Sequence, residues 1–167
     1  MPSLTRLALI LAVVFSLLVT SRIAHAAQPP VNIIFDTDVD HDCDDIGALF
    51  ILHAAVERSE AKLLATIGCT SSDSIAPCLD AMNTWFGRPE IPVGTLKDPG
   101  LLVGPHYTTE LVKRFPHRFQ SGKDSPDAVV LYRQILAKEP DGSVVTRAPF
   151  DSKGISRGKR LLPRAAS

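Results

Sequence analysis

A short apolar segment that ends abruptly in acidic residues constrains this chain most. Residues 31–35 read Val-Asn-Ile-Ile-Phe, an apolar, β-branched pattern typical of a strand buried on both faces of a sheet. Ligands of open parallel sheets bind at the carboxyl ends of the strands, so we expect a functional site where this strand ends. Six aspartates follow it within ten residues: Asp36, Asp38, Asp40, Asp42, Asp44 and Asp45.

The rest of the chain alternates apolar runs with helix-like segments. Apolar residues recur at helical spacing after the acidic stretch and again before Gly87, which is placed to cap a helix. Strands and helices in alternation imply βαβ units, so we expect an α/β fold: a mainly parallel sheet with helices on both faces. The expected elements are strands at 31–35, 63–67 and 91–93, helices at 46–57, 74–86 and 126–138, and a further strand that begins at 143.

Local patterns add expectations about a loop and about packing. Residues 94–124 are rich in Gly, Pro and His and predict a long loop that could fold over the site. Ser125 is the expected N-cap of the helix that follows. Asn83 and Trp85 are interpreted as packing residues. The cysteines are too few for a disulfide scaffold and are expected to pack as small apolar groups, although a Cys69–Cys78 bridge stays open; they are Cys43, Cys69 and Cys78.

Residues 1–26 have the pattern of a leader. Arg6 precedes an apolar run at 7–19, and this run of about 13 residues is shorter than the roughly 20 that a membrane-spanning helix needs. Residues 24–26, Ala-His-Ala, offer small side chains where a signal peptidase cuts. We expect export, with cleavage after Ala26 and no membrane contact of the mature chain; an uncleaved membrane anchor is the alternative.

Charge is distributed unevenly along the chain. The 18 basic and 18 acidic side chains give a net charge of zero, which argues against nucleic acid as the main partner. Residues 146–167 nevertheless hold six basic side chains and one acidic side chain, so they are interpreted as an atypical basic tail without a strand pattern. The expected organisation is a signal peptide at 1–26, a domain at 27–145 and the tail.

The acidic stretch predicts a bound cation. A helix N-terminus stabilises a carboxylate by only about 0.3–1 kcal/mol, too little for several converging negative charges. Hard oxygen donors without a thiolate or imidazole pattern select Ca²⁺ or Mg²⁺. An EF-hand is excluded, because a loop that starts at Asp36 has His41 at the position that needs glycine. A solvated acidic loop without a site is the alternative.

The acidic stretch is also the first of several collinear blocks. It reads Ile34-Phe35-Asp36-Thr37-Asp38, followed by Asp42 and by Asp44-Asp45 at the start of a small, apolar helix. Further blocks lie at residues 64–68, 80–94, 126–133 and 140–144. Together they resemble the inosine-uridine preferring nucleoside hydrolases over about residues 31–145.

The resemblance implies hydrolysis of the N-glycosidic bond of ribonucleosides with one bound Ca²⁺, or less readily Mg²⁺. Carried over by position, Asp38 would be the general base. Asp44 and Asp45 would bind the calcium, and Asp36 would bind it or lie just behind it. A neighbouring cation should keep these carboxylates ionised at neutral pH.

The residues that would bind substrate are less closely matched. The loop is two residues longer than the family's shorter form, so Asp40 and Asp42 are rival candidates for the roles given to Asp38, Asp44 and Asp45. Asp42 is also a candidate for substrate binding. Asp73 stands near the position where the family usually has an asparagine, and it would accept a hydrogen bond from a ribose hydroxyl. The alternative is that Asp73 or Ser74 caps the next helix. The expected partner is a small ribonucleoside, and association into a homo-oligomer stays open.

Family members are about twice as long, and they supply further calcium ligands and a catalytic histidine from beyond the strand at 143. No such motif occurs here, so we expect an N-terminal portion, apparently truncated, that is weakly active or inactive alone. Two other functions stay open. One is a phosphatase of the haloacid dehalogenase type, with Asp36 of the segment Asp36-Thr37-Asp38-Val39 as nucleophile beside Mg²⁺. The other is a non-catalytic Ca²⁺-binding remnant.

Overall fold

The computed structural model describes residues 28–40, 43–70, 72–97 and 107–147. The predicted signal peptide, the candidate Asp42 and the predicted tail beyond Arg147 lie outside the described residues. Within the described ranges, no helix is long and apolar enough to cross a membrane.

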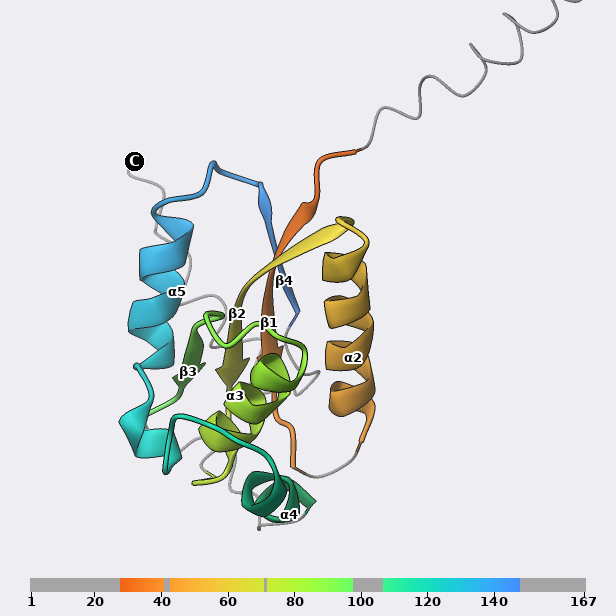
Figure 1. The fold of residues 1–167 in the computed structure, drawn as a ribbon. Coiled ribbons are helices and arrows are strands. Elements are labelled where there is room, and N and C mark those ends of the chain that lie inside the picture. The colour runs from red at the N-terminus through yellow and green to blue at the C-terminus, as the bar shows by residue number, and fades with distance from the viewer. Residues whose placement is uncertain (1–27, 41–42, 71, 98–106, 148–167) are drawn as a thin grey trace, which may run out of the picture.

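Four strands form one parallel sheet in the order β3-β2-β1-β4, which confirms the expected α/β class. The strands β1 and β2 are central, and the carboxyl ends of the strands meet at one edge (Figure 1). The elements in chain order are β1 (Val31–Thr37), α2 (Asp44–Glu57), β2 (Ala61–Gly68), α3 (Ile75–Trp85), β3 (Val93–Thr95), α4 (Tyr107–Arg114), the 3-10 helix η1 (Gly122–Asp124), α5 (Ala128–Leu136) and β4 (Val144–Arg147).

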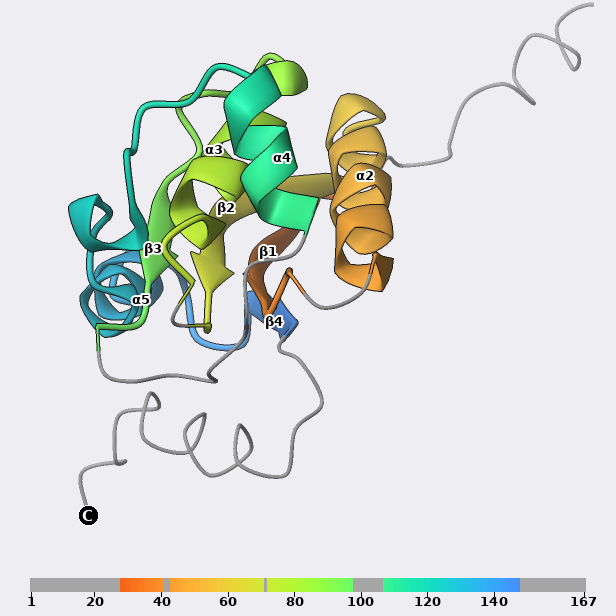
Figure 2. The same ribbon diagram turned by 90° about the horizontal axis from the view of Figure 1, so that it is seen from below.

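Helices cover both faces of the sheet, as expected. The helices α2, α3 and α4 lie on one face and α5 lies on the other (Figure 2). Phe35 packs with Leu49 and Leu79 on the first face, whereas Ile34 packs with Leu131 on the second. Adjacent residues of a strand point to opposite faces, and both Ile34 and Phe35 are buried. The prediction that this strand is buried on both faces is therefore confirmed.

The helix α5 begins later than expected. Asp127, not Ser125, is its N-cap, because the Asp127 Oδ1 accepts a hydrogen bond from the backbone N of Val130 at 3.0 Å. The Ser125 hydroxyl is buried and lies 2.8 Å from the Thr95 hydroxyl. The backbone N of Thr95 donates to the carbonyl oxygen of Pro126 at 3.0 Å. These bonds dock the start of α5 onto β3 and take Ser125 away from the helix.

The prediction of one long loop over residues 94–124 is wrong in part, because α4 and η1 lie within it. The helix α4 packs Leu111 against the core of the first face. The turn at η1 is held by Lys97, whose ammonium donates to the carbonyl oxygens of Gly122 at 2.8 Å and Ser125 at 2.7 Å. The η1 turn is thus held by polar contacts, whereas α4 is held by apolar packing.

A buried polar network joins α2, α3 and β2. The Nδ1 of His53 accepts from the Arg88 guanidinium at 3.2 Å, and its Nε2 donates to the Asn83 Oδ1 at 3.1 Å. Asn83 donates in turn to the Thr66 hydroxyl at 3.1 Å. A guanidinium can only donate, so His53 is the neutral tautomer; burial, and then the charge of Arg88, lower the pKa of His53 to about 4. The packing role of Asn83 is confirmed, but Trp85 is 67% exposed, so that prediction is wrong.

The cysteines differ from one another. Cys78 is buried, as expected of a small apolar group, and Cys69 is half-buried. Cys43, the residue before α2, is exposed, so the expectation that it packs as a small apolar group is wrong. All three thiols are free, so Cys69 and Cys78 form no bridge.

The strand expected from residue 143 is β4, which pairs with β1 at the edge of the sheet. It continues through Thr146, paired with Ile34, to Arg147. The interpretation of these two residues as part of a tail without strand structure is therefore wrong. Edge strands pair through backbone groups and need no apolar side chain on each face, and Val145 is indeed 52% exposed.

Candidate functional site

Carboxylates from two elements meet at the carboxyl end of β1. Asp36 is the penultimate residue of β1, Asp38 follows the strand, and Asp45 lies in the first turn of α2. The Asp45 Oδ2 accepts hydrogen bonds from the Thr37 hydroxyl at 2.6 Å and from the backbone N of Asp38 at 3.2 Å. These two bonds hold the start of α2 against the end of β1 and bring three of the predicted site residues together.

Asp36 is the most deeply placed of these carboxylates. Its Oδ2 accepts a hydrogen bond from the Tyr132 hydroxyl at 3.2 Å. Its Oδ1 is buried and has no hydrogen-bond partner among the described residues. Burial raises the pKa of Asp36 to about 7, and the negative charges of Asp38 and Asp45 add to that rise. Hydrogen bonds from Tyr132 and from the backbone of Thr37 lower this pKa but do not offset the burial; the expectation that a bound cation keeps these carboxylates ionised stays a prediction.

Asp44 is placed differently from its neighbour. Its side chain is exposed, and its Oδ1 accepts from the backbone N of Asp45 at 2.9 Å. Successive helix residues point about 100° apart, so Asp44 and Asp45 leave the first turn of α2 in different directions. The structure brings Asp45 into the cluster and leaves Asp44 at its outer side.

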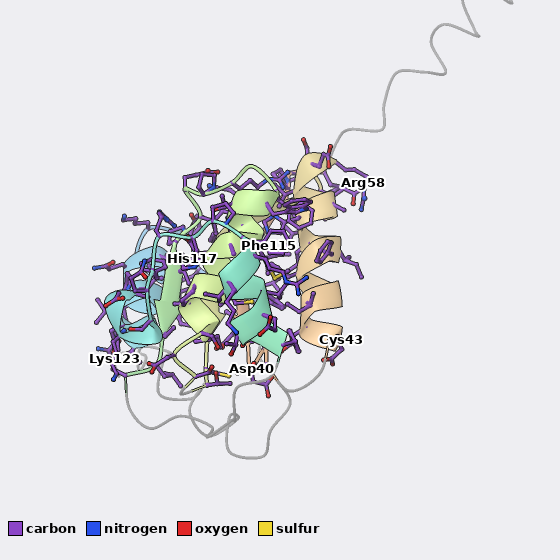
Figure 3. The ribbon with its side chains drawn as sticks, turned by 60° about the horizontal axis from the view of Figure 1, so that its bottom comes forward. Asp40, Cys43, Arg58, Phe115, His117 and Lys123 are labelled. Atoms are coloured by element: carbon purple, nitrogen blue, oxygen red, sulfur yellow. The ribbon has the colours of Figure 1, made fainter. Side chains whose placement is uncertain are left out.

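Asp40, a rival candidate, is held by the protein. It is fully buried, and its Oδ1 accepts from the hydroxyl of Thr108 at the start of α4. The Thr108 hydroxyl lies 2.7 Å from that of Ser74, at the start of α3. Asp40 has a φ of 149°, a conformation that side-chain-bearing residues rarely adopt. Asp40 and Cys43 lie at the same end of the molecule, away from Arg58 (Figure 3). Through the hydrogen bond to Thr108, which in turn contacts Ser74, Asp40 anchors the acidic loop to α3 and α4.

The candidate Asp73 is exposed and precedes α3. Its carbonyl oxygen accepts from the backbone N of Gly122 at 2.9 Å. Ser74 occupies the N-cap position of α3 but makes no capping hydrogen bond with its side chain. The alternative that Asp73 or Ser74 caps this helix is therefore confirmed for Ser74 by position, although without a side-chain hydrogen bond. The binding of a ribose hydroxyl by Asp73 stays a prediction.

Cys69 follows β2 and adjoins the carboxylates. Its backbone N donates to the carbonyl oxygen of Thr37 at 2.9 Å. Burial, and then the charges of Asp36, Asp38 and Asp45, raise the pKa of the Cys69 thiol well above its ordinary value. The thiol stays protonated at neutral pH, which excludes a thiolate nucleophile at this position.

The donors at this edge suit a hard cation in their chemistry. Among the described residues, no three His, Cys, Asp or Glu side chains lie close enough together to hold a metal ion as they stand. A buried carboxylate oxygen without a donor is nevertheless unfavourable, and the Asp36 Oδ1 is such an atom. Oxygen ligands of this kind are those that Ca²⁺ and Mg²⁺ prefer. Asp36 and Asp45 thus offer the donor type that a divalent cation prefers, but the described residues do not bring enough such donors together to form a site for one.

Sequence reasoning missed two residues of this region, Tyr132 and Thr108. Tyr132 is 4% exposed on the apolar face of α5, and a buried tyrosine hydroxyl usually has a hydrogen-bond partner, which is the signal that could have found it. Thr108 lies within the segment predicted as a loop and gave no such signal. Comparisons of the chain with models of protein families, with curated proteins and with solved structures found no match.

Proposed function

We propose that this chain belongs to the nucleoside hydrolases and that its acidic edge cleaves the N-glycosidic bond of ribonucleosides with water. One observation supports this most: Asp36, Asp38 and Asp45 converge at the carboxyl end of β1, and one carboxylate oxygen there is buried without a donor. Such an uncompensated cluster at this edge of a parallel sheet is typical of a ligand site.

Each carboxylate has a role in this proposal. Asp36 and Asp45, with Asp44 from the outer side, would hold a Ca²⁺ ion, which when bound would orient the sugar hydroxyls and acidify a water molecule. Asp38 would be the general base. It follows β1 directly, and the Asp45 carboxylate accepts from its backbone N, so its position is fixed relative to the carboxylates on either side.

The bond changes follow from these positions. The water oxygen attacks the anomeric carbon of the ribose while one of the water protons passes to the Asp38 carboxylate. The bond from that carbon to the base nitrogen breaks, and its electron pair leaves with the base, which takes up a proton from solvent; Asp38 then returns its proton to solvent, so the net reaction consumes one water molecule. The ring develops positive charge as the bond breaks, and the surrounding carboxylates favour that charge.

A phosphatase with Asp36 as nucleophile has less support. A nucleophilic carboxylate must be ionised and must reach the phosphorus with one oxygen. The Asp36 Oδ2 accepts from Tyr132 and its Oδ1 is buried, so neither oxygen is open to an approaching phosphorus atom. These features favour a carboxylate that holds a ligand over one that attacks.

The test offers the purified chain inosine, uridine and p-nitrophenyl phosphate, with CaCl₂ or with EGTA. Release of reducing ribose and of phosphate is measured. We expect ribose release that is slow in this chain, that needs Ca²⁺, and that falls at least 100-fold in Asp38→Asn, because a general base contributes about 10²–10⁴ to the rate. Asp141→Asn is the matched control, since Asp141 is exposed in the turn before β4, and it should retain the full rate.

Each other result overturns the proposal in its own way. Phosphate release that is lost in Asp36→Asn would establish the phosphatase instead. Calcium binding with neither product would leave a non-catalytic calcium-binding chain. Ribose release that survives Asp38→Asn would remove the proposed base and with it the mechanism.

A further inference from the structure

The helix α2 packs on the core with two fully buried side chains, Leu49 and His53. Partly buried apolar side chains beside them complete this contact, while the outer side of α2 is open, with Phe50 46% and Ile51 69% exposed. Leu49 belongs to the apolar cluster of the first face, whereas His53 is held by hydrogen bonds. The attachment of α2 therefore depends in part on a side chain that can take up a proton.

His53 is bonded at both ring nitrogens to α3 and to the turn that follows it. Its Nε2 lies 3.1 Å from the Asn83 Oδ1, and its Nδ1 lies 3.2 Å from the Arg88 Nη1. Its ring also stacks on that of Phe86, with the ring centroids 4.3 Å apart. These three contacts join α2 to the end of α3.

The hydrogen bonds of His53 run in one direction. The Arg88 guanidinium can only donate, so the Nδ1 of His53 has to accept. Asn83 donates its amide N–H to the Thr66 hydroxyl at 3.1 Å, so its oxygen faces His53 and Nε2 has to donate. A further proton can therefore bind only at Nδ1. It would remove the acceptor of Arg88 and bring two positive charges into contact, which is unfavourable in a buried site.

No carboxylate among the described residues offsets this second charge. Arg88 is the charged group that acts on His53: burial and then this charge lower the pKa of His53 to about 4, although the hydrogen bond to Asn83 raises it. On α3, Asp80 is bonded to Arg118. The other acidic and basic residues of the surrounding elements are exposed or lie at the far end of α2: Glu57, Glu90 and Lys62, and Asp44 with Asp45.

We propose that His53 and Arg88 form an acid-sensitive switch: a proton on His53 separates it from Arg88 and releases α2 from α3. In the released helix the ring regains its ordinary pKa of 6.5, against about 4 in the held helix. Acid therefore favours release as the pH falls from about 6.5 to about 4, and the contact is stable above this range. The inference goes beyond the proposed function, because it needs neither a cation nor a substrate.

Release of α2 would reach the acidic edge of the sheet. Asp45, in the first turn of α2, accepts from the Thr37 hydroxyl at 2.6 Å and from the backbone N of Asp38 at 3.2 Å. Packed helices move as units when they slide, so a shift at His53 displaces Asp45 too. The switch thus links the acidity of the surroundings to the geometry at the end of β1.

The test measures hydrogen–deuterium exchange of the α2 amides in the full chain at pH 7.5 and pH 5, expressed as protection factors. With a pKa of about 4 in the held helix and 6.5 in the released one, the protection of α2 should fall about 30-fold on acidification. His53→Gln takes up no proton in this range and should remove the fall. His117→Gln is the matched control: His117 is a half-buried histidine whose Nδ1 bonds to the carbonyl oxygen of Phe119, and the fall should persist.

A second variant covers the case in which His53→Gln does not fold. Arg88→Gln keeps a neutral donor and removes the charge, so the fall in α2 protection should be smaller than in the wild type. The midpoint of the His53 imidazole in a proton NMR titration should rise in this variant. An equal fall in Arg88→Gln, an unchanged fall in His53→Gln, or constant protection in the wild type would each overturn the inference. So would an equal fall in α5, on the other face of the sheet, because acid would then unfold the whole domain.

Discussion

Asp36 and Asp80 are both buried aspartates, and their surroundings are opposite. Asp80 on α3 is fully buried, and its two oxygens accept three hydrogen bonds from Arg118: from Nε at 2.9 Å, from Nη2 at 2.6 Å and from the backbone N at 2.6 Å. Asp36 has neutral donors, the Tyr132 hydroxyl at 3.2 Å and the backbone of Thr37, and lies beside two further carboxylates. The charge of Asp80 is neutralised by Arg118, whereas no cationic side chain among the described residues neutralises Asp36.

The difference is the one expected between a carboxylate that stabilises the fold and one with the role proposed above for Asp36. Burial disfavours an ionised group unless it is paired. Through these three hydrogen bonds Arg118 ties the segment before η1 to Asp80 on α3, so the pair contributes to stability. At Asp36 the same unfavourable burial is accepted without a cationic partner in the protein, which is characteristic of groups kept for binding or catalysis.

The largest effect is expected from neutralising Asp36 in the absence of metal. Its folded-state pKa of about 7 lies above the ordinary value of 3.8, so the folded chain binds the proton more tightly and its stability falls as pH rises from about 4 to 7. Asp36→Asn lacks this loss. In urea unfolding with EGTA, the variant should equal the wild type at pH 4 and exceed it at pH 8 by up to about 4 kcal/mol.

The control for this prediction is Asp73→Asn, because Asp73 is exposed. Its difference from the wild type should stay within about 0.5 kcal/mol at both pH values. If Asp36→Asn were no more stable than the wild type at pH 8, the carboxylate would be compensated in solution and the contrast with Asp80 would disappear.

Removing the partner of Asp80 should have the opposite sign. Arg118→Ala leaves a buried carboxylate unpaired, and we expect a loss of about 3 kcal/mol in the free energy of unfolding, at the lower end for buried pairs because the Arg118 side chain is 51% exposed. Urea unfolding at pH 7 measures it. Lys113→Ala removes an ion pair whose side chains are both exposed and should cost less than about 1 kcal/mol; similar losses in the two variants would contradict the prediction.

A smaller effect is expected in the neutral network around His53. Asn83→Ala leaves the Nε2 of His53 without its acceptor and the Thr66 hydroxyl without its donor, so the free energy of unfolding should fall by about 2 kcal/mol. Gln134→Ala, at an exposed position of α5, is the control and should change it by no more than about 0.5 kcal/mol. A loss in Asn83→Ala as small as in the control would show that this network adds little to stability.

Much of the fold could be predicted because its strands and longer helices are marked by local apolar patterns. The run at 31–35 and the period at 74–86 each indicate one element, and the structure has both. The helix α4 was missed because its sequence is largely polar and its stability depends on packing against α3, which no local pattern reveals. The N-cap of α5 was misplaced because the Ser125 hydroxyl is used by Thr95, a residue far away in the chain.

The site was predictable only where it is local. Asp36, Asp38 and Asp45 lie in one short stretch, so the sequence alone brings them together at the end of β1. It could not distinguish exposed Asp44 from Asp45, because the strand end and the helix start set their directions in space. Tyr132 enters from α5 through the topology of the sheet, and the burial of Asp40 depends on α4. Contacts between distant elements follow from the fold and not from spacing along the chain.

The position of Lys97 has a consequence for chemical labelling. Four oxygen atoms surround its amine, those of Thr95, Gly122, Lys123 and Ser125. An amine held in this way must give up its hydrogen bonds before it can be acylated, so in mass spectrometry after limited acetylation Lys97 should be modified more slowly than Lys62 on β2, which is exposed. Once acetylated, its neutral amide could no longer make these bonds, and protease cleavage near residue 122 would report the release of the turn.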